Sequence, residues 1–220
     1  GKVLSSTDIW SEYGVEQCFN VEFIKRPKWW RLGSVIFGVR AGQKVKHSLP
    51  DLLYGRCPHS LAWSCRLRIP FIYESHNLPK GGMRKRIENF LFKRENFVRL
   101  VVITESLKKA YLNSYVELDA EQVVVAHDGA DAVTKATVSE PFNKNNPLKV
   151  GYAGSLYPGK AMEIIVALAK ADPEYEYHIV GGNGPLEKWW TEAPSNVVFH
   201  GHISHAEVSQ VLSTFDILLL

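Results

Sequence analysis

The segment Lys149–Lys160, which reads KVGYAGSLYPGK, combines the residue types that bind a phosphate group. A strand-like run leads into Gly154 and Ser155, and Lys160 follows a Pro-Gly turn where a helix is expected to open. A helix N-terminus carries roughly half a positive charge, and a lysine adds a full one. The pattern is typical either of a diphosphate site or of a strand-to-helix turn with a solvated lysine.

A second glycine-rich turn follows at His178–Pro185, which reads HIVGGNGP. Three glycines within four positions indicate a strained turn or a backbone that a ligand approaches closely. The spacing departs from the GxGxxG dinucleotide fingerprint, because Pro185 interrupts it. Ligands of open parallel sheets bind at the carboxyl ends of the strands, so the two turns together predict one phosphate-binding edge.

Ionisable side chains follow two further strand-like runs. Glu74 and His76 close one of them, and a histidine at a sheet edge can donate a hydrogen bond or transfer a proton near neutral pH. The alternative is a loop histidine whose ring bonds only to the backbone. Residues 127–131 read HDGAD and follow another run, where Asp128 would also suit a helix N-cap.

A basic and aromatic run lies at Lys25–Arg40. Its cations and tryptophans are Lys25, Arg26, Lys28, Trp29, Trp30 and Arg31. Apolar residues at helical spacing favour a helix packed on the core, whereas tryptophans beside four cations are also typical of a membrane-interface patch. A second basic stretch, Lys80–Arg86, is either a solvated face or a surface for an anionic acceptor.

Short β-branched runs alternate with longer amphipathic runs, which predicts βα units and parallel sheets. In residues 1–141 we expect strands at Lys2–Ser5, Val21–Ile24, Asp51–Tyr54, Phe71–Glu74, Val98–Thr104 and Gln122–Ala126. Helices are expected there at Lys28–Val45, Ser60–Leu67, Gly82–Phe92 and Ser106–Ser114, the last with Thr104 or Ser106 as its cap.

The same alternation continues after an irregular segment. Residues 139–147 read SEPFNKNNP and have no periodicity, so residues 142–147 are predicted to be a linker. In residues 148–220 strands are expected at Lys149–Tyr152, Tyr175–Val180, Val197–His200 and Ile217–Leu220. Helices are expected at Lys160–Ala171, Pro185–Thr191 and Ser204–Ser213. The fold class is therefore α/β, with two Rossmann-like, doubly wound parallel-sheet domains, 1–141 and 148–220.

Composition and charge narrow the function classes. The 220 residues are 45% hydrophobic and 22% charged, which excludes disordered and fibrous proteins. Residues 1–140 contain 21 Lys and Arg against 15 Asp and Glu, a net charge of +6, whereas residues 141–220 contain 5 against 8, a net charge of −3. The whole chain carries only +3 and has no groove-reading motif, so nucleic acid is a poor fit.

The three cysteines, Cys18, Cys57 and Cys65, form no CxxC pair, which disfavours a disulfide scaffold and a zinc module. No metal-ligand cluster is visible, and neither a metal nor another cofactor is expected. The apolar runs fall far short of the roughly 18 residues that span a bilayer. We therefore expect a cytoplasmic protein, with peripheral attachment to the inner face of the membrane as the alternative.

Taken in order, these motifs resemble the retaining nucleotide-sugar glycosyltransferases of the GT-B fold, family 4 type. The resemblance covers nearly all of the chain and assigns residues 1–141 to the acceptor side and residues 148–220 to the donor side. It implies a donor diphosphate site at Gly154, Ser155, Lys160, Asp128 and Gly129, and a nucleotide site at Gly182, Asn183, Gly184, Pro185, Gly201 and His202. It further implies catalytic roles for His76 and Lys160.

The sequence departs from the family pattern at several places. Ser155 stands where the family has an arginine, and Ala161 where it has a glycine. The family's glutamate pair would follow Leu220 and its first strand would precede Gly1, so the chain resembles an internal fragment, which is expected to be inactive alone.

The implied reaction moves a sugar from a nucleoside diphosphate to an acceptor hydroxyl with retention, in cell-surface polysaccharide or glycolipid synthesis. The partners would be a nucleotide sugar, a lipid-linked acceptor and an anionic membrane surface. Two alternatives stay open: a non-catalytic nucleotide-binding or membrane-associated scaffold of the same fold, and a sugar-nucleotide epimerase.

Overall fold

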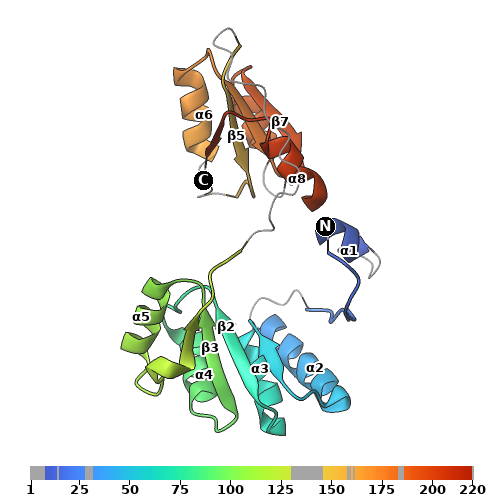
Figure 1. The fold of residues 1–220 in the computed structure, drawn as a ribbon, viewed down its shortest axis with the longest axis vertical. Coiled ribbons are helices and arrows are strands. Elements are labelled where there is room, and N and C mark those ends of the chain that lie inside the picture. Colours follow the sequence, from blue (N-terminus) through green and yellow to red (C-terminus); the bar gives the residue numbers. More distant parts are fainter. Residues whose placement is uncertain are drawn as a thin grey trace. The chain divides into compact units, whose positions relative to one another are not determined.

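The computed structural model describes residues 8–13, 15–27, 32–129, 146–157, 160, 162–182 and 186–219. The chain divides into two compact units, each built around a four-stranded parallel sheet (Figure 1). The first unit is Glu22–Ala130, and the second is Asp131–Leu220 together with Gly1–Val21. The predicted linker at 142–147 lies largely outside the described residues, and its bounds stay a prediction.

The first unit contains the sheet β1-β2-β3-β4, in which neighbouring strands run parallel. Its strands are β1 (Leu53–Gly55), β2 (Phe71–Ser75), β3 (Phe97–Val102) and β4 (Val123–Val125). Its helices are α2 (Gly33–Ser48), α3 (Pro58–Ser64), α4 (Gly82–Phe92) and α5 (Glu105–Ser114), with short 3-10 turns η1 (Cys65–Leu67) and η2 (Ala120–Gln122).

Strand β2 divides its side chains between the two faces of this sheet. Phe71, Tyr73 and Ser75 are buried, whereas Ile72 and Glu74 are partly exposed. This is the period of two that a pleated strand imposes. The pairing of β2 with β3 shifts register once, between Phe71 and Ile72. The buried face joins the core formed by Leu91, Phe92, Leu100, Val102, Tyr111 and Tyr115.

The second unit contains the parallel sheet β7-β6-β5-β8. Its elements are α1 (Asp8–Tyr13), β5 (Lys149–Ala153), α6 (Met162–Ala171), β6 (Glu176–Val180), α7 (Leu186–Glu192), β7 (Val197–Gly201), α8 (His205–Leu212) and β8 (Ile217–Leu219). Helices α6 and α7 cover one face of the sheet, because Met162, Ile165 and Trp189 share a core with Tyr152 and Ile179.

Most predicted elements are confirmed to within a few residues. Helix α4 has the predicted bounds, and Thr104 caps α5 by accepting a hydrogen bond from the Leu107 N–H at 3.1 Å. Strand β3 ends at Val102 rather than at the predicted Thr104, because Thr104 is the N-cap residue of α5 and does not pair with a neighbouring strand. The predicted strand Lys2–Ser5 lies outside the described residues.

The predicted strand Val21–Ile24 is wrong. Residues 15–27 form neither helix nor strand, and the part from Glu22 onward is fastened to α2 by side chains instead of by a ladder. The Arg40 guanidinium donates to the Lys25 carbonyl at 2.7 Å, and Lys44 pairs with Glu22 at 2.8 Å. These contacts hold the segment beside a helix, and no ladder partner for residues 21–24 is found among the described residues.

Helix α2 begins at Gly33, and Leu32 before it is exposed. Its buried residues are Gly33 and Gly38 rather than an apolar stripe. A Cβ at Gly38 would lie 2.8 Å from the His59 carbonyl oxygen of α3. The missing side chain therefore lets the two helices approach closely, a contact that hydrophobic periodicity does not reveal.

Two histidines and a phenylalanine stack on one another in the second unit. The His178 ring centroid lies 5.1 Å from that of Phe215, and His178 Nδ1 lies 2.9 Å from His200 Nε2. Burial lowers the pKa of His178, and the neighbouring His200 and Lys149 act in the same direction, against the opposing effect of Glu176. Folding therefore favours the neutral ring.

We expect the second unit to lose stability as the pH falls below about 6.5, because the unfolded His178 then binds a proton that the folded ring resists. The contribution is on the order of 1 kcal/mol per unit of pKa shift. Urea unfolding at pH 7.5 and 5.5 should show a smaller difference for His178→Phe than for the wild type, while the exposed His47→Phe serves as control. An unchanged pH dependence in His178→Phe would contradict this assignment.

Candidate functional site

A pocket of about 300 Å³ opens at the carboxyl ends of β5, β6 and β7 in the second unit. Its lining residues are Ala153, Gly154, Ser155, Val180, Gly181, Gly182, His202, Ile203 and Val208. The lining combines small, backbone-exposing residues with an apolar wall and contains no carboxylate. Small residues beside an apolar wall are typical of the sites that bind small molecules.

The turns that form this pocket are held together through their backbones. The Gly154 N–H donates to the Val180 carbonyl at 2.9 Å, and the Gly181 N–H donates to the Gly201 carbonyl at 2.8 Å. Gly181 has a φ of +138°, and a Cβ there would lie 1.8 Å from the Gly154 carbonyl oxygen. Only glycine fits at position 181, because both the dihedral angle and the space exclude a side chain.

The pocket brings together four of the predicted site residues: Gly154, Ser155, Gly182 and His202. Gly201 lies beside them through its bond to Gly181. The Tyr152 hydroxyl donates to the Ser155 carbonyl at 3.0 Å and so fixes the turn from the strand side. The predicted residues Asn183, Gly184 and Pro185 lie outside the described residues.

Lys160 is not among the lining residues. Its side chain is exposed, and its backbone N–H donates to the Tyr157 carbonyl at 3.0 Å. Sequence reasoning missed Gly181 and the apolar wall of Val180, Ile203 and Val208. The doubled glycine directly after a strand was the available signal for Gly181, whereas the wall residues carry no chemical signature.

The first unit places His76 in a polar cluster at the carboxyl ends of β1 and β2. His76 Nε2 lies 2.5 Å from Glu74 Oε1, and Arg56 Nη2 lies 2.9 Å from His76 Nδ1. The Tyr54 hydroxyl donates to the other Glu74 oxygen at 2.6 Å. The interpretation of His76 as a loop histidine bonded only to the backbone is therefore wrong, since both ring nitrogens have side-chain partners.

These partners assign the tautomer of His76. A guanidinium can only donate, so Nδ1 accepts from Arg56 and Nε2 carries the proton that Glu74 accepts. The Tyr54 hydrogen bond holds the pKa of Glu74 below its usual range, and His76 and Arg56 act in the same direction against partial burial. Glu74 is thus a carboxylate at neutral pH, and the imidazole is fixed between it and a cation.

Asp128 and Gly129 also belong to the first unit, where they follow β4 in an exposed irregular segment. His127 Nδ1 contacts the Ile103 carbonyl at 2.9 Å, which ties this segment to the end of β3. A helix capped by Asp128 would extend beyond Gly129 and so lies outside the described residues, and the N-cap interpretation stays a prediction. The role of Asp128 toward a donor diphosphate stays a prediction as well.

Within the described part of the chain, no group of three or more His, Cys, Asp or Glu side chains is placed to hold a metal ion. No helix among the described residues is long and apolar enough to cross a membrane. The expectation of a reaction without a metal or another cofactor stays a prediction.

No protein-family model matches the sequence, and neither does any curated protein. Solved structures are similar in fold. The Anabaena protein Alr3699/HepE in complex with UDP and glucose has 19% identity and a TM-score of 0.63, and the alignment covers 89% of this chain and 59% of that one. The apo lipopolysaccharide outer core galactosyltransferase WaaB has 18% identity and a TM-score of 0.57, with 84% and 54% covered.

A third similar structure belongs to another enzyme class. UDP-GlcNAc 2-epimerase from Neisseria meningitidis, bound to UDP-GlcNAc, has 12% identity and a TM-score of 0.54, with 96% of this chain and 65% of that one covered. This chain thus spans about half to two thirds of the length of these proteins. Together the comparisons confirm the predicted fold class: α/β with two parallel four-stranded sheets, matching structures of the GT-B fold.

Proposed function

We propose that the chain is part of a glycosyltransferase that moves a sugar from a nucleoside diphosphate sugar to an acceptor hydroxyl with retention. The observation that carries the proposal is the glycine-lined pocket at the carboxyl ends of β5, β6 and β7, where parallel-sheet proteins bind their ligands. We place the reaction in the synthesis of cell-surface polysaccharide or glycolipid.

The pocket residues would act mainly on the leaving group. As the bond between the sugar's anomeric carbon and the diphosphate oxygen breaks, negative charge builds on the diphosphate. The Ser155 hydroxyl, backbone N–H groups of the turns and the Lys160 ammonium would stabilise that charge. The acceptor oxygen bonds to the anomeric carbon on the same face, and its proton passes to the departing diphosphate.

His76 would orient the donor sugar and its phosphate, and Asp128 with Gly129 would contribute to the diphosphate site. The nucleotide itself would be held by the turn at Gly182–Pro185 and by Gly201 and His202. The fixed tautomer of His76 supports an orienting role, because an imidazole held between Arg56 and Glu74 presents its ring in one geometry.

An epimerase is the second candidate, because UDP-GlcNAc 2-epimerase structures match this fold with TM-scores near those of the transferases. Calorimetric titration of the full-length protein with UDP and GDP, followed by mass spectrometry of products from nucleotide sugars, separates the candidates. Transfer to an acceptor supports the proposal, isomerised donor supports the epimerase, and binding with neither product supports a scaffold.

Lys160→Ala in the full-length enzyme should lower turnover by about 100-fold, because the leaving diphosphate loses one positive charge that stabilises it. Affinity for UDP should fall, whereas affinity for uridine should stay nearly unchanged. The matched control is Lys170→Ala, which removes the same charge from the last turn of α6. An equal loss of affinity for UDP and uridine would identify Lys160 as a structural residue.

Gly181→Ala should abolish UDP binding while the second unit still folds at reduced stability, because the added methyl group and the Gly154 carbonyl cannot both keep their places. Glu163→Ala is the control, since this exposed residue of α6 lies in the same unit and outside the pocket lining. For both variants, calorimetry measures the affinity for UDP and circular dichroism measures folding. Wild-type UDP affinity in Gly181→Ala would argue against this pocket as the nucleotide site.

The basic run should bind anionic membranes if the acceptor is lipid-linked. Lys25 and Arg26 are exposed in the structure, whereas residues 28–31 lie outside the described part. Arg40 and Lys46 of α2 extend the basic surface around a pocket of about 670 Å³ that Lys25 also lines. Each cation near an anionic leaflet contributes about 1 kcal/mol, so neutralising four should lower the bound fraction at least tenfold.

Vesicle sedimentation with and without anionic lipid measures this attachment. The test variant carries glutamine at positions 25, 26, 28 and 31, and the control carries it at positions 66, 68, 108 and 109. Salt should release the wild type, because the charges are screened. If lipid charge and the test substitutions leave the bound fraction unchanged, the run is a solvated surface and its tryptophans belong to the core.

A further inference from the structure

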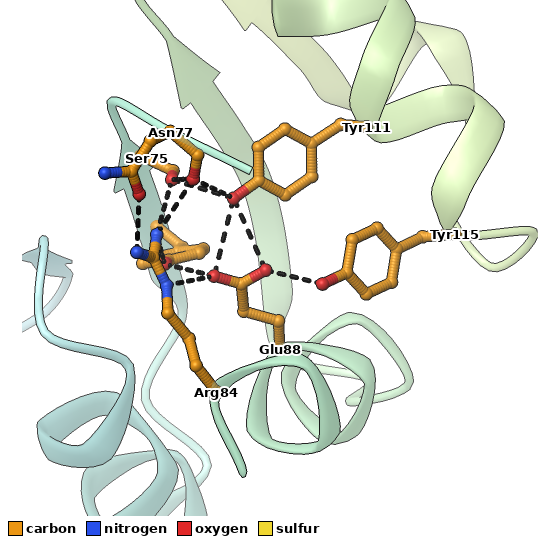
Figure 2. A network of polar contacts seen from close by, with 7 residues as sticks. Ser75, Asn77, Arg84, Glu88, Tyr111 and Tyr115 are labelled. Carbon is orange, nitrogen blue, oxygen red and sulfur yellow. Dashed lines mark hydrogen bonds and ion pairs between the residues drawn. The ribbon is translucent and has the colours of Figure 1, made fainter. Parts of the chain in front are cut away.

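Glu88 of α4 is fully buried, and its carboxylate is surrounded by hydroxyl groups (Figure 2). The Tyr73 hydroxyl donates to Oε1 and the Tyr115 hydroxyl to Oε2, each at 2.7 Å. Arg84 Nε donates to Oε1 at 2.8 Å, one helical turn earlier. Burial raises the pKa of Tyr111 to about 12, and the nearby Glu88 adds to this effect. The tyrosines therefore remain hydrogen-bond donors at all physiological pH values.

Arg84 connects this buried carboxylate to the turn that follows β2. Its Nη1 donates to Asn77 Oδ1 at 2.5 Å, and its Nη2 lies 3.0 Å from both the Asn77 carbonyl oxygen and Ser75 Oγ. The guanidinium thus donates to Glu88 through Nε and to the turn through Nη1 and Nη2. A lysine ammonium cannot make hydrogen bonds in both directions with this geometry.

Tyr111 of α5 contacts the same turn from the other side. Its hydroxyl lies 2.7 Å from Ser75 Oγ and 3.2 Å from the Asn77 carbonyl oxygen, and 3.3 to 3.4 Å from the carboxylate of Glu88. The neighbouring Tyr115 stacks on Tyr111 with ring centroids 5.6 Å apart, yet its hydroxyl bonds to Glu88 alone. Tyr111 therefore contacts both the turn and, more weakly, Glu88, whereas Tyr115 bonds to Glu88 and does not contact the turn (Figure 2).

Ser75 and Asn77 are the two neighbours of His76 in the chain. The network holds both of them, while the His76 ring points to Glu74 and Arg56 on the other side of the strand. A buried charged network is weak evidence for stability alone, because apolar residues of similar volume often stabilise a core as well or better. The network also contacts the residues on both sides of His76, namely Ser75 and Asn77, and stability alone does not explain these contacts.

We propose that Arg84 and Tyr111 are positioning residues of His76, with Glu88 as the buried anchor that holds them. This proposal rests on the proposed function only for its effect on turnover; the geometry of the His76 turn is independent of the reaction. Loss of either contact would free residues 75–77 to shift and would break the alignment of the imidazole with Glu74.

The first test compares Tyr111→Phe with Tyr115→Phe, each of which removes one hydroxyl from the same buried network. The readout is the NMR spectrum of the His76 ring in the ligand-free chain, assigned by its disappearance in His76→Gln. Tyr111→Phe should shift the ring nitrogen signals away from the single tautomer with a protonated Nε2. Tyr115→Phe should lower the melting temperature comparably and leave the His76 signals unchanged.

The second test compares Arg84→Met with Arg86→Met on the same helix, where Arg86 is exposed. Arg84→Met should shift the His76 signals and Arg86→Met should not, while Arg84→Lys should fail to restore the wild-type spectrum. In the full-length enzyme, Tyr111→Phe should lower turnover by about tenfold to 100-fold and change UDP affinity less than twofold, because a small misplacement near the chemistry is costly.

Unchanged His76 signals in both Tyr111→Phe and Arg84→Met would overturn the proposal. An equal shift in Tyr115→Phe would overturn it as well, because the network would then act through stability alone. If the His76 signals respond as expected and the wild type transfers no sugar, the positioning inference holds and the proposed function fails. Normal turnover with shifted signals would overturn the link between this positioning and catalysis.

Discussion

The second unit depends on a contact between two backbones that leaves no room for a side chain. The carbonyl oxygen of Gly154 occupies the position that a Cβ of residue 181 would take, so the turns after β5 and β6 lie against each other. The hydrogen bonds from Gly154 to Val180 and from Gly181 to Gly201 then bring the ends of three strands together. Because the two turns lie against each other backbone to backbone, the shape of the pocket depends on glycine at position 181.

In the first unit, side chains instead of peptide groups hold the turn at the carboxyl end of β2. The turn that carries His76 has no glycine, and Arg84, Tyr111 and Ser75 supply its hydrogen bonds instead. The cost is a buried carboxylate, which the tyrosine hydroxyls and the guanidinium offset. The two units thus present polar groups at the carboxyl ends of their strands by different means, peptide groups in one and a charged network in the other.

Sequence reasoning recovered most strands and helices, because hydrophobic periodicity reports which face of an element is buried. It also singled out Gly154, Ser155 and Gly182 from the glycine-rich turns after two strands, and His202 only through the resemblance to GT-B glycosyltransferases. It misread Val21–Ile24, where Glu22 pairs with Lys44 of a helix, and it treated Arg84, which bonds to the buried Glu88, as part of a basic surface stretch. Both errors have one cause: the partners of a long side chain are set by tertiary contacts, which hydrophobic periodicity does not report.

Strand β2 contributes to both the buried Glu88 network and the contacts of His76, because its alternate residues lie on opposite faces of the sheet. Beyond the register shift at Phe71 and Ile72, the side chains of Tyr73 and Ser75 enter the buried network and that of Glu74 faces His76 and Arg56. Inserting or deleting one residue here would exchange the two sets, exposing the tyrosine and burying the carboxylate. In related sequences, the number of residues in this strand should therefore vary less than their chemical identity, so a gap in an alignment at β2 would mark a change of function more clearly than a substitution.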